Sequence, residues 1–119
     1  MAYDAELADR IRELIAAEHG VEEKRMFGGL AFLINGNMSV AASSKGGLLV
    51  RVPPSETETL LARDHVEPMV MAGRETRGWL RVGADGVRTK RQLSPWVTRG
   101  VAYAKSLPAK ERIGRFPTG

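Results

Sequence analysis

The clearest alternation of apolar and polar positions lies on either side of Asn35-Gly36. Alternation at every second residue predicts β-strands, and Asn-Gly is typical of the turn of a β-hairpin. A two-residue loop would place Ile34 opposite Asn37 and mix polar with apolar side chains on one face. We therefore expect a three-residue loop that includes Asn37. The pairs predicted from that loop are Ile34 with Met38, Phe32 with Val40, and Leu30 with Ala42.

Further strands flank this hairpin. Gly28-Gly29 follows a short strand and predicts a bend or bulge, and Pro68 marks a later boundary. The sequence GRETRG at residues 73–78 predicts a polar turn bracketed by two glycines. The strands expected from these signals cover residues 23–27, the hairpin at 30–43, then 48–52, 69–72 and 79–82.

Three segments with apolar residues at helical spacing predict helices. Asp4 is typical of an N-cap, and the first helix is expected to end at Gly20. Ser55-Glu56-Thr57-Glu58 has the spacing of a capping box for a short second helix reaching about residue 63. Ser94-Pro95 predicts the start of a third helix that ends near residue 106.

The expected element order is α-β3-α-β2-α, which favours a two-layer α+β domain with helices on an antiparallel sheet. Gly100 lies four residues after a tryptophan and indicates a close approach of the third helix to the sheet. We expect one domain over residues 1–110. Residues 111–119 are expected to form a flexible tail unless Ile113 and Phe116 dock.

The composition narrows the classes of function. The 119 residues are 43% hydrophobic, enough for one domain with a core. There is no cysteine, which excludes disulfides, thiolate catalysis and cysteine-based metal sites. The N-terminus carries acidic residues and no long apolar run is present, so we expect a cytoplasmic protein without a membrane segment.

The net charge of +4 is unevenly distributed. Residues 1–73 hold 7 basic and 11 acidic residues, whereas residues 74–119 hold 11 basic and 3 acidic residues. A basic C-terminal third predicts contact with an acidic partner, either nucleic acid or an acidic protein surface. The alternative is a solvated basic face, because charge alone gives attraction without sequence specificity.

Two groups of residues in this basic third are candidate binding sites. Arg77, Trp79 and Arg81 share one face of a predicted strand and would form a stacking platform for unstacked bases. The alternative places Trp79 in the core with the arginines at its rim. The second group is Arg88, Lys90 and Arg91, which precede the predicted third helix. Cations at a helix N-terminus are repelled by the helix dipole, and a bound anion would relieve this repulsion. The alternative interpretation is a solvated loop.

Residue patterns that indicate catalysis or metal binding are absent. The two histidines, His19 and His65, have no second ligand type at metal spacing. There is no nucleophile elbow, no Walker loop and no dinucleotide-binding glycine motif. We therefore predict no catalytic residue, no cofactor and no metal site.

Several motifs identify a family. They are KRMFGG, which contains Arg25 to Gly29, then Gly78-Trp79, and Trp96 with the helix ending in Ser106-Leu107-Pro108. From about residue 6 to residue 110 the chain resembles the N-terminal domain of the TfoX/Sxy family, regulators of bacterial competence. The resemblance implies an α+β fold similar to secretion-chaperone-like folds and a non-catalytic transcription co-regulator. Family regulators carry a second, C-terminal domain, so we expect a stand-alone copy of the first.

The preferred hypothesis is a regulatory interaction module that binds a protein or nucleic acid through the basic C-terminal third. The alternative is a small-molecule-binding domain or an enzyme with a pocket between the hairpin and the helices, lined by Met26, Met38 and Trp96. A homodimer through an exposed strand edge is a third hypothesis.

Overall fold

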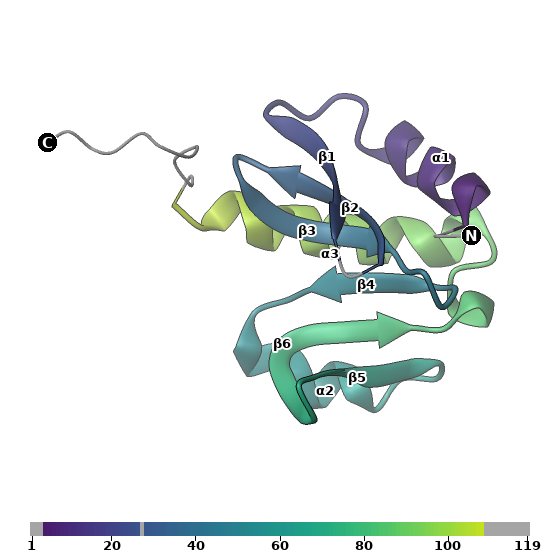
Figure 1. The fold of residues 1–119 in the computed structure, drawn as a ribbon, viewed down its shortest axis with the longest axis vertical. Helices are drawn as coiled ribbons and strands as arrows, with labels where there is room; N and C mark the ends of the chain where they lie inside the picture. Colours follow the sequence, from purple (N-terminus) through teal and green to yellow (C-terminus); the bar gives the residue numbers. More distant parts are fainter. Residues whose placement is uncertain (1–3, 27, 109–119) are drawn as a thin grey trace, which may run out of the picture.

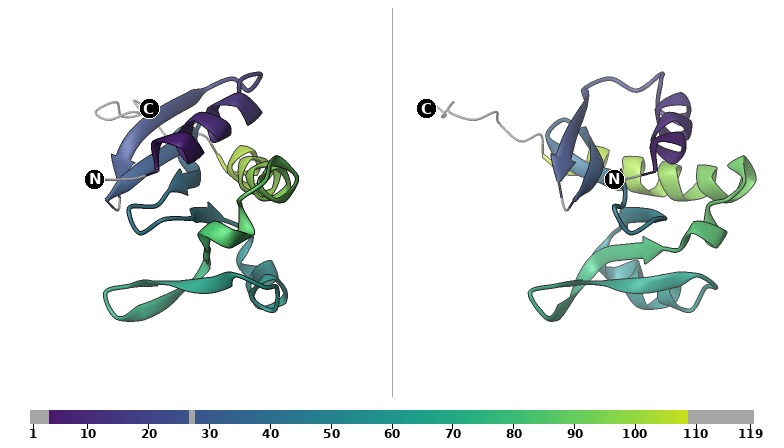
Figure 2. Two further views of the ribbon diagram at one scale, coloured as in Figure 1. Left: turned by 90° about the vertical axis from the view of Figure 1, so that its right-hand side faces the viewer. Right: turned by 45° about the vertical axis from the view of Figure 1, so that its right-hand side comes forward.

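The computed structural model describes residues 4–26 and 28–108. Six antiparallel strands form one sheet in the order β1-β2-β3-β4-β6-β5, and helices cover one of its sides (Figures 1 and 2). The strands are β1 (Val21–Met26), β2 (Gly29–Ile34), β3 (Asn37–Ala42), β4 (Leu48–Arg51), β5 (Val66–Met71) and β6 (Arg74–Val82). The helices are α1 (Ala5–Leu14), α2 (Thr57–Leu61) and α3 (Lys90–Ser106), with 3₁₀ turns η1 (Pro54–Glu56) and η2 (Ala84–Gly86).

The α+β class with an antiparallel sheet is confirmed, but the predicted element order is wrong. Four strands precede α2 rather than three, because the hairpin supplies β2 and β3 in addition to β1 and β4. The connection from β1 to β2 is itself tight. Met26 pairs with Gly29, and Gly28 in the connection has a φ of +78°, which glycine adopts without steric cost.

The central hairpin combines a two-residue turn with a β-bulge. Asn35 and Gly36 have positive φ angles of 53° and 83°, so Ile34 pairs with Asn37, and the predicted pairing with Met38 is wrong. The register shifts beside Phe32, and the extra residue is Ser39. This fully buried serine donates its hydroxyl to the Phe32 carbonyl at 2.8 Å. The bulge restores the two other predicted pairs, Phe32 with Val40 and Leu30 with Ala42.

Both faces of the central strands are buried. The face toward the helices carries the main core, in which Phe32, Val50 and Leu80 are fully enclosed. The opposite face carries a second cluster because the bulge turns Met38 to that side. Its buried members are Ala31, Leu33, Met38, Ala41, Leu49 and Met69, with Met26 and Trp79 packed at the margin.

Helix α3 lies directly on strands β3 and β4, as Gly100 predicts. A Cβ atom at this position would lie 2.7 Å from the Ser39 carbonyl oxygen and 2.8 Å from a methyl group of Val40. Real Cβ contacts are not that short, so only glycine allows the observed separation. The close contact fixes the position of α3, which lines both of the grooves described below.

The helix starts differ from the predictions in two of three cases. Asp4 caps α1 as expected, accepting the amides of Glu6 and Leu7, but the helix ends at Leu14 rather than at Gly20. The capping box predicted for the second helix is not formed. Ser55 lies inside η1, and no side chain caps α2.

The third helix begins at Lys90, four residues before the predicted start at Ser94. Thr89 accepts the Gln92 amide and Gln92 returns a bond to the Thr89 amide, so the capping box is T-x-x-Q. Pro95 lies inside α3 near its start and removes only one hydrogen-bond donor there.

Strands β5 and β6 are longer than predicted. The GRETRG segment is mostly strand, and the turn is formed by Ala72 and Gly73, with φ angles of 52° and 79°. Pro68 lies within β5, which is an edge strand where a missing amide is tolerated. Phe27, Ile113, Phe116 and the predicted tail lie outside the described residues. Among the described helices, none is long and apolar enough to cross a membrane.

Candidate functional site

The three predicted residues of β6, Arg77, Trp79 and Arg81, have different surroundings. Leu80 and Val82 point into the helix-covered core, and Trp79 packs against the second cluster on the opposite face. Arg81 lies half-buried on the same strand. Arg77 donates a hydrogen bond from Nη2 to the Pro54 carbonyl at 2.9 Å and therefore holds η1 against β6.

A guanidinium that stacks on Trp79 comes from Arg51, a residue that the sequence analysis did not select. Arg51 pairs with Trp79 across strands β4 and β6, and its Cζ atom lies 5.1 Å from the centre of the indole. The same Cζ atom lies 5.7 Å from the centre of the Tyr103 ring on α3. One arginine thus joins an aromatic residue of the sheet to one of the helix.

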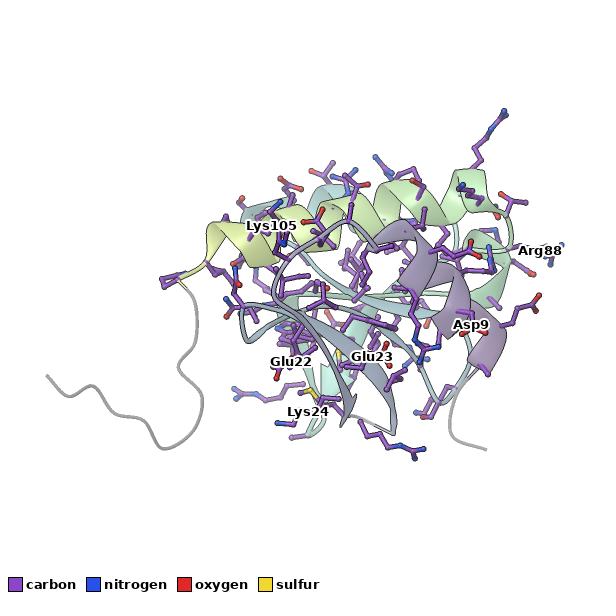
Figure 3. All side chains as sticks on the ribbon, turned by 90° about the horizontal axis from the view of Figure 1, so that it is seen from above. Asp9, Glu22, Glu23, Lys24, Arg88 and Lys105 are labelled. Carbon is purple, nitrogen blue, oxygen red and sulfur yellow. The ribbon has the colours of Figure 1, made fainter. Side chains whose placement is uncertain are left out.

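The second predicted group, Arg88, Lys90 and Arg91, lies at the start of α3. Lys90 and Arg91 are the first two residues of α3, not part of a preceding loop, and both are exposed. Within residues 4–26 and 28–108, neither side chain has a hydrogen-bond or ion-pair partner. Arg88 pairs with the Asp85 carboxylate. Figure 3 shows Arg88 and Lys105 at opposite ends of α3.

A second arginine-aromatic cluster surrounds Trp96. The Cζ atoms of Arg63 and Arg99 lie 5.6 and 5.7 Å from the centre of its ring. Trp96 is only 7% exposed, so its indole belongs to the core while the two guanidiniums extend to the surface. Trp96 beside two arginines is an arrangement that the sequence analysis did not predict at this position.

A groove of about 630 Å³ runs between α3 and η1 and lies between these two clusters. Its lining is largely apolar, with Pro53, Pro95, Ala102 and Tyr103, and it includes the hydroxyl groups of Ser94, Thr98 and Ser106. The charged groups in its wall are Glu56 from η1 and Arg99 from α3. The full lining is Pro53, Glu56, Ser94, Pro95, Thr98, Arg99, Ala102, Tyr103 and Ser106.

The Arg99 guanidinium has few partners. Its Nη1 atom lies 3.4 Å from the Glu56 Oε1 atom, at the long end of the range for a hydrogen bond. Its Nε atom is buried and has no hydrogen-bond partner among the described residues. Buried donors without partners are rare in folded proteins, because each one costs about 1–3 kcal/mol.

A smaller groove of about 370 Å³ lies on the other side of the same helix, between α1 and α3. It is lined by side chains that include Leu14, Ile15, Val97 and Val101. At its end the Lys105 ammonium forms a 3.0 Å ion pair with the carboxylate of Glu18.

Helix α1 is held to strand β1 by a bidentate ion pair. Arg12 donates from Nε and Nη2 to the two carboxylate oxygens of Glu23, at 2.6 and 2.8 Å. These hydrogen bonds hold the pKa of Glu23 below its ordinary value and raise that of Arg12. In Figure 3, Glu23 lies toward α1, whereas Glu22 and Lys24 lie on the side away from α3. This ion pair positions α1, and with it one wall of the smaller groove.

The proposed pocket between the hairpin and the helices is not formed by the residues predicted to line it. Met26 and Met38 belong to the second cluster, while Trp96 belongs to the core on the other side of the sheet. The hairpin and α3 are in direct contact at Gly100. Among the described residues, no group of three or more histidine, aspartate or glutamate side chains is placed to hold a metal ion.

Comparison with family models gives one match. The model of the TfoX N-terminal domain matches residues 13–104, which is most of the chain and includes both arginine-aromatic clusters and the groove lining except Ser106. Comparisons with curated proteins and with solved structures find no match. The motifs noted in the sequence lie largely within the matched region. The chain therefore belongs to the TfoX N-terminal domain family.

Proposed function

We propose that this domain is a non-catalytic regulatory module, acting in the cytoplasm, that binds a protein partner in the groove between α3 and η1. Family membership supports a regulatory role, and transcription co-regulation is the process we assign to it. In this proposal the domain contributes a surface that positions a partner and performs no chemical reaction.

The observation that carries this proposal is the composition of the groove and its surroundings. Protein interfaces are enriched in tryptophan, tyrosine and arginine, and their energetic centres combine an apolar floor with a polar rim. The groove has Tyr103 and two prolines in its lining, and Arg51 stacks on Tyr103 from one side. The stacks pre-order the guanidiniums, which lowers the entropy lost when a partner binds.

Nucleic acid is the second candidate, favoured by the exposed side chains of Lys90 and Arg91 at the start of α3. A nucleic-acid footprint requires cations aligned along one backbone track. Arg88 is neutralised by Asp85, and Arg77 is bound to the Pro54 carbonyl. The predicted basic residues therefore favour nucleic acid less than the groove favours a protein.

A homodimer through a sheet edge is the least supported arrangement. Strand β1 carries four charged residues, Glu22, Glu23, Lys24 and Arg25, and strand β5 carries Pro68. Both features discourage edge pairing. The likeness to secretion-chaperone-like folds stays a prediction.

Site-specific photocrosslinking in the native cell tests the proposal. A benzoylphenylalanine introduced at Ser106, in the groove lining, is expected to give a discrete adduct with one protein. The matched control places the same group at exposed Ala72 in the β5–β6 turn, where no adduct is expected. Equal adducts at both positions, or none at Ser106 together with salt-sensitive binding of labelled DNA or RNA, would refute the groove as the functional surface.

A further inference from the structure

We infer that the groove between α3 and η1 takes an acidic, amphipathic segment of the partner, and that a carboxylate of this segment replaces Glu56 at Arg99. The inference rests on the proposed function and specifies the chemistry of the partner. Three observations carry it: the charge around the groove, the incomplete bonding of Arg99 and the dimensions of the groove.

The charge around the groove favours an acidic ligand. Arg99 lies in the groove wall and Arg51 contacts Tyr103 of its lining, whereas Glu56 is the acidic residue in that lining. Arg63 and Arg77 contact Trp96 and Pro54, which belong to α3 and η1 but do not line the groove. Complementary charge of this kind steers association and selects against basic partners.

The bonding of Arg99 identifies the point of contact. A guanidinium has five donors in a fixed planar fork, which suits a carboxylate bound through two parallel hydrogen bonds. Arg99 makes one long contact to Glu56 at 3.4 Å, and its Nε atom is buried without a partner among the described residues. Glu56 is 46% exposed, so it can leave Arg99 when a better-placed carboxylate arrives. Arg99 must also turn for Nε to meet the ligand.

The dimensions of the groove favour a helical or short extended segment. Its lining extends along α3 from Ser94 to Ser106, which corresponds to about 18 Å at the rise of an α-helix. This length accommodates about three turns of an amphipathic helix with its apolar face on Pro95, Ala102 and Tyr103. The carboxylate would project from the edge of that helix toward Arg99.

Three synthetic peptides of about 14 residues serve as probes. They share leucines at positions i, i+3, i+4 and i+7 and carry glutamate, glutamine or lysine at the polar positions. The purified full chain is expected to bind the glutamate peptide about tenfold more tightly than the glutamine peptide, and the lysine peptide most weakly. Equal affinity for the glutamate and glutamine peptides would overturn the inference.

Matched variants locate the effect. In R99Q the preference for glutamate over glutamine should disappear, and in R99K it should fall because the planar fork is lost while the charge is kept. In E56Q the glutamate peptide should bind about threefold more tightly, because the internal competitor is removed. R91Q changes the same charge at the exposed start of α3 and should leave the preference within about twofold. A larger loss in R91Q than in R99Q would contradict the assignment.

The two proposals fail in different ways. If the Ser106 adduct forms in cells and persists in the R99Q variant, the groove binds a partner but not through a carboxylate at Arg99. If the adduct is lost in R99Q and the glutamate preference is observed, both proposals hold. The melting temperature of each variant is measured as a control, and an unchanged value excludes loss of the fold as the cause of lost binding.

Discussion

Helix α3 has a groove on each side, and the two grooves differ in how their charges are satisfied. Between α1 and α3, Lys105 and Glu18 form a 3.0 Å ion pair, and the nearby walls are aliphatic. Between α3 and η1, Arg99 reaches Glu56 only at 3.4 Å and keeps a buried Nε without a partner among the described residues. The first groove has the features of a packed seam in the fold. The second contains a buried hydrogen-bond donor, the Arg99 Nε–H, that a bound ligand could pair with. An available donor of this kind is expected of a recognition site.

The largest effect is expected at Gly100, where α3, which lines both grooves, contacts the sheet. Gly100→Val would place side-chain atoms within 2.7 Å of the Ser39 carbonyl and force α3 away from the sheet. We expect the free energy of unfolding to fall by about 3 kcal/mol, measured by urea denaturation. Thr98→Val, at an exposed position on the same helix, is the control and should change stability by less than about 0.5 kcal/mol. Unchanged stability in Gly100→Val would refute the close contact.

A more selective change affects only the wall formed by η1. The buried Thr57 hydroxyl accepts the Gly78 amide at 2.9 Å and thereby fixes the start of α2 to β6. Thr57→Val leaves that amide without a partner, so stability should fall by about 1–3 kcal/mol. Amide chemical shifts should change around the α3–η1 groove and not around the α1–α3 groove. The control is Thr59→Val at an exposed position of α2, and equal losses in both variants would contradict the assignment.

Glu23→Gln tests the attachment of α1, which forms the other groove. Because the pKa of Glu23 is lowered in the folded state, its contribution is fully present above the unfolded glutamate pKa of about 4.3. It is lost as the pH falls through the lower, folded value. We expect a decrease of at most a few degrees in melting temperature at pH 7. The difference between the variant and the parent should vanish in acid, and a constant difference down to low pH would exclude the ion pair as its cause.

The smallest changes in stability are expected when the two ion pairs of α3, Lys105 with Glu18 and Arg99 with Glu56, are broken one at a time. Glu18→Gln should destabilise the fold by about 0.5 kcal/mol, because it breaks a 3.0 Å pair that is only partly exposed. Glu56→Gln should cost less, since the Arg99 contact is longer. Chemical denaturation of both variants in parallel measures the difference. A larger loss in Glu56→Gln would mean that this pair is structural and would weaken the case for a binding groove.

Some local signals in the sequence predicted the local structure. Asp4 was identifiable as a cap from residue type and position, and Gly100 indicated close packing because it lacks a side chain. Alternation along β6 set Trp79 apart from its neighbours: Trp79 packs on the second cluster, whereas Leu80 and Val82 lie in the main core. The start of α3 was missed although Thr89 and Gln92 carried a capping-box signal, because the Ser94-Pro95 pair was given more weight.

Features that depend on distant residues were not predictable. The bulge at Ser39 is fixed by a hydrogen bond across the hairpin and by the packing of both sheet faces, which alternation in one strand does not reveal. Strand β6 begins in a polar stretch, where no apolar pattern marks it. The groove joins Arg99 with Glu56, residues 43 positions apart, and neither was selected from the sequence. Charge counting identified the basic third but not which cations share a surface.

The most direct test follows the Arg99 Nε–H signal by nuclear magnetic resonance while the glutamate peptide is added to the labelled full chain. The account predicts a large change in this signal, smaller changes at Tyr103 and Ala102, and little change at Lys105 in the other groove. Changes concentrated at Arg88, Lys90 and Arg91, with Arg99 unaffected, would contradict the account and place the acidic ligand at the start of α3.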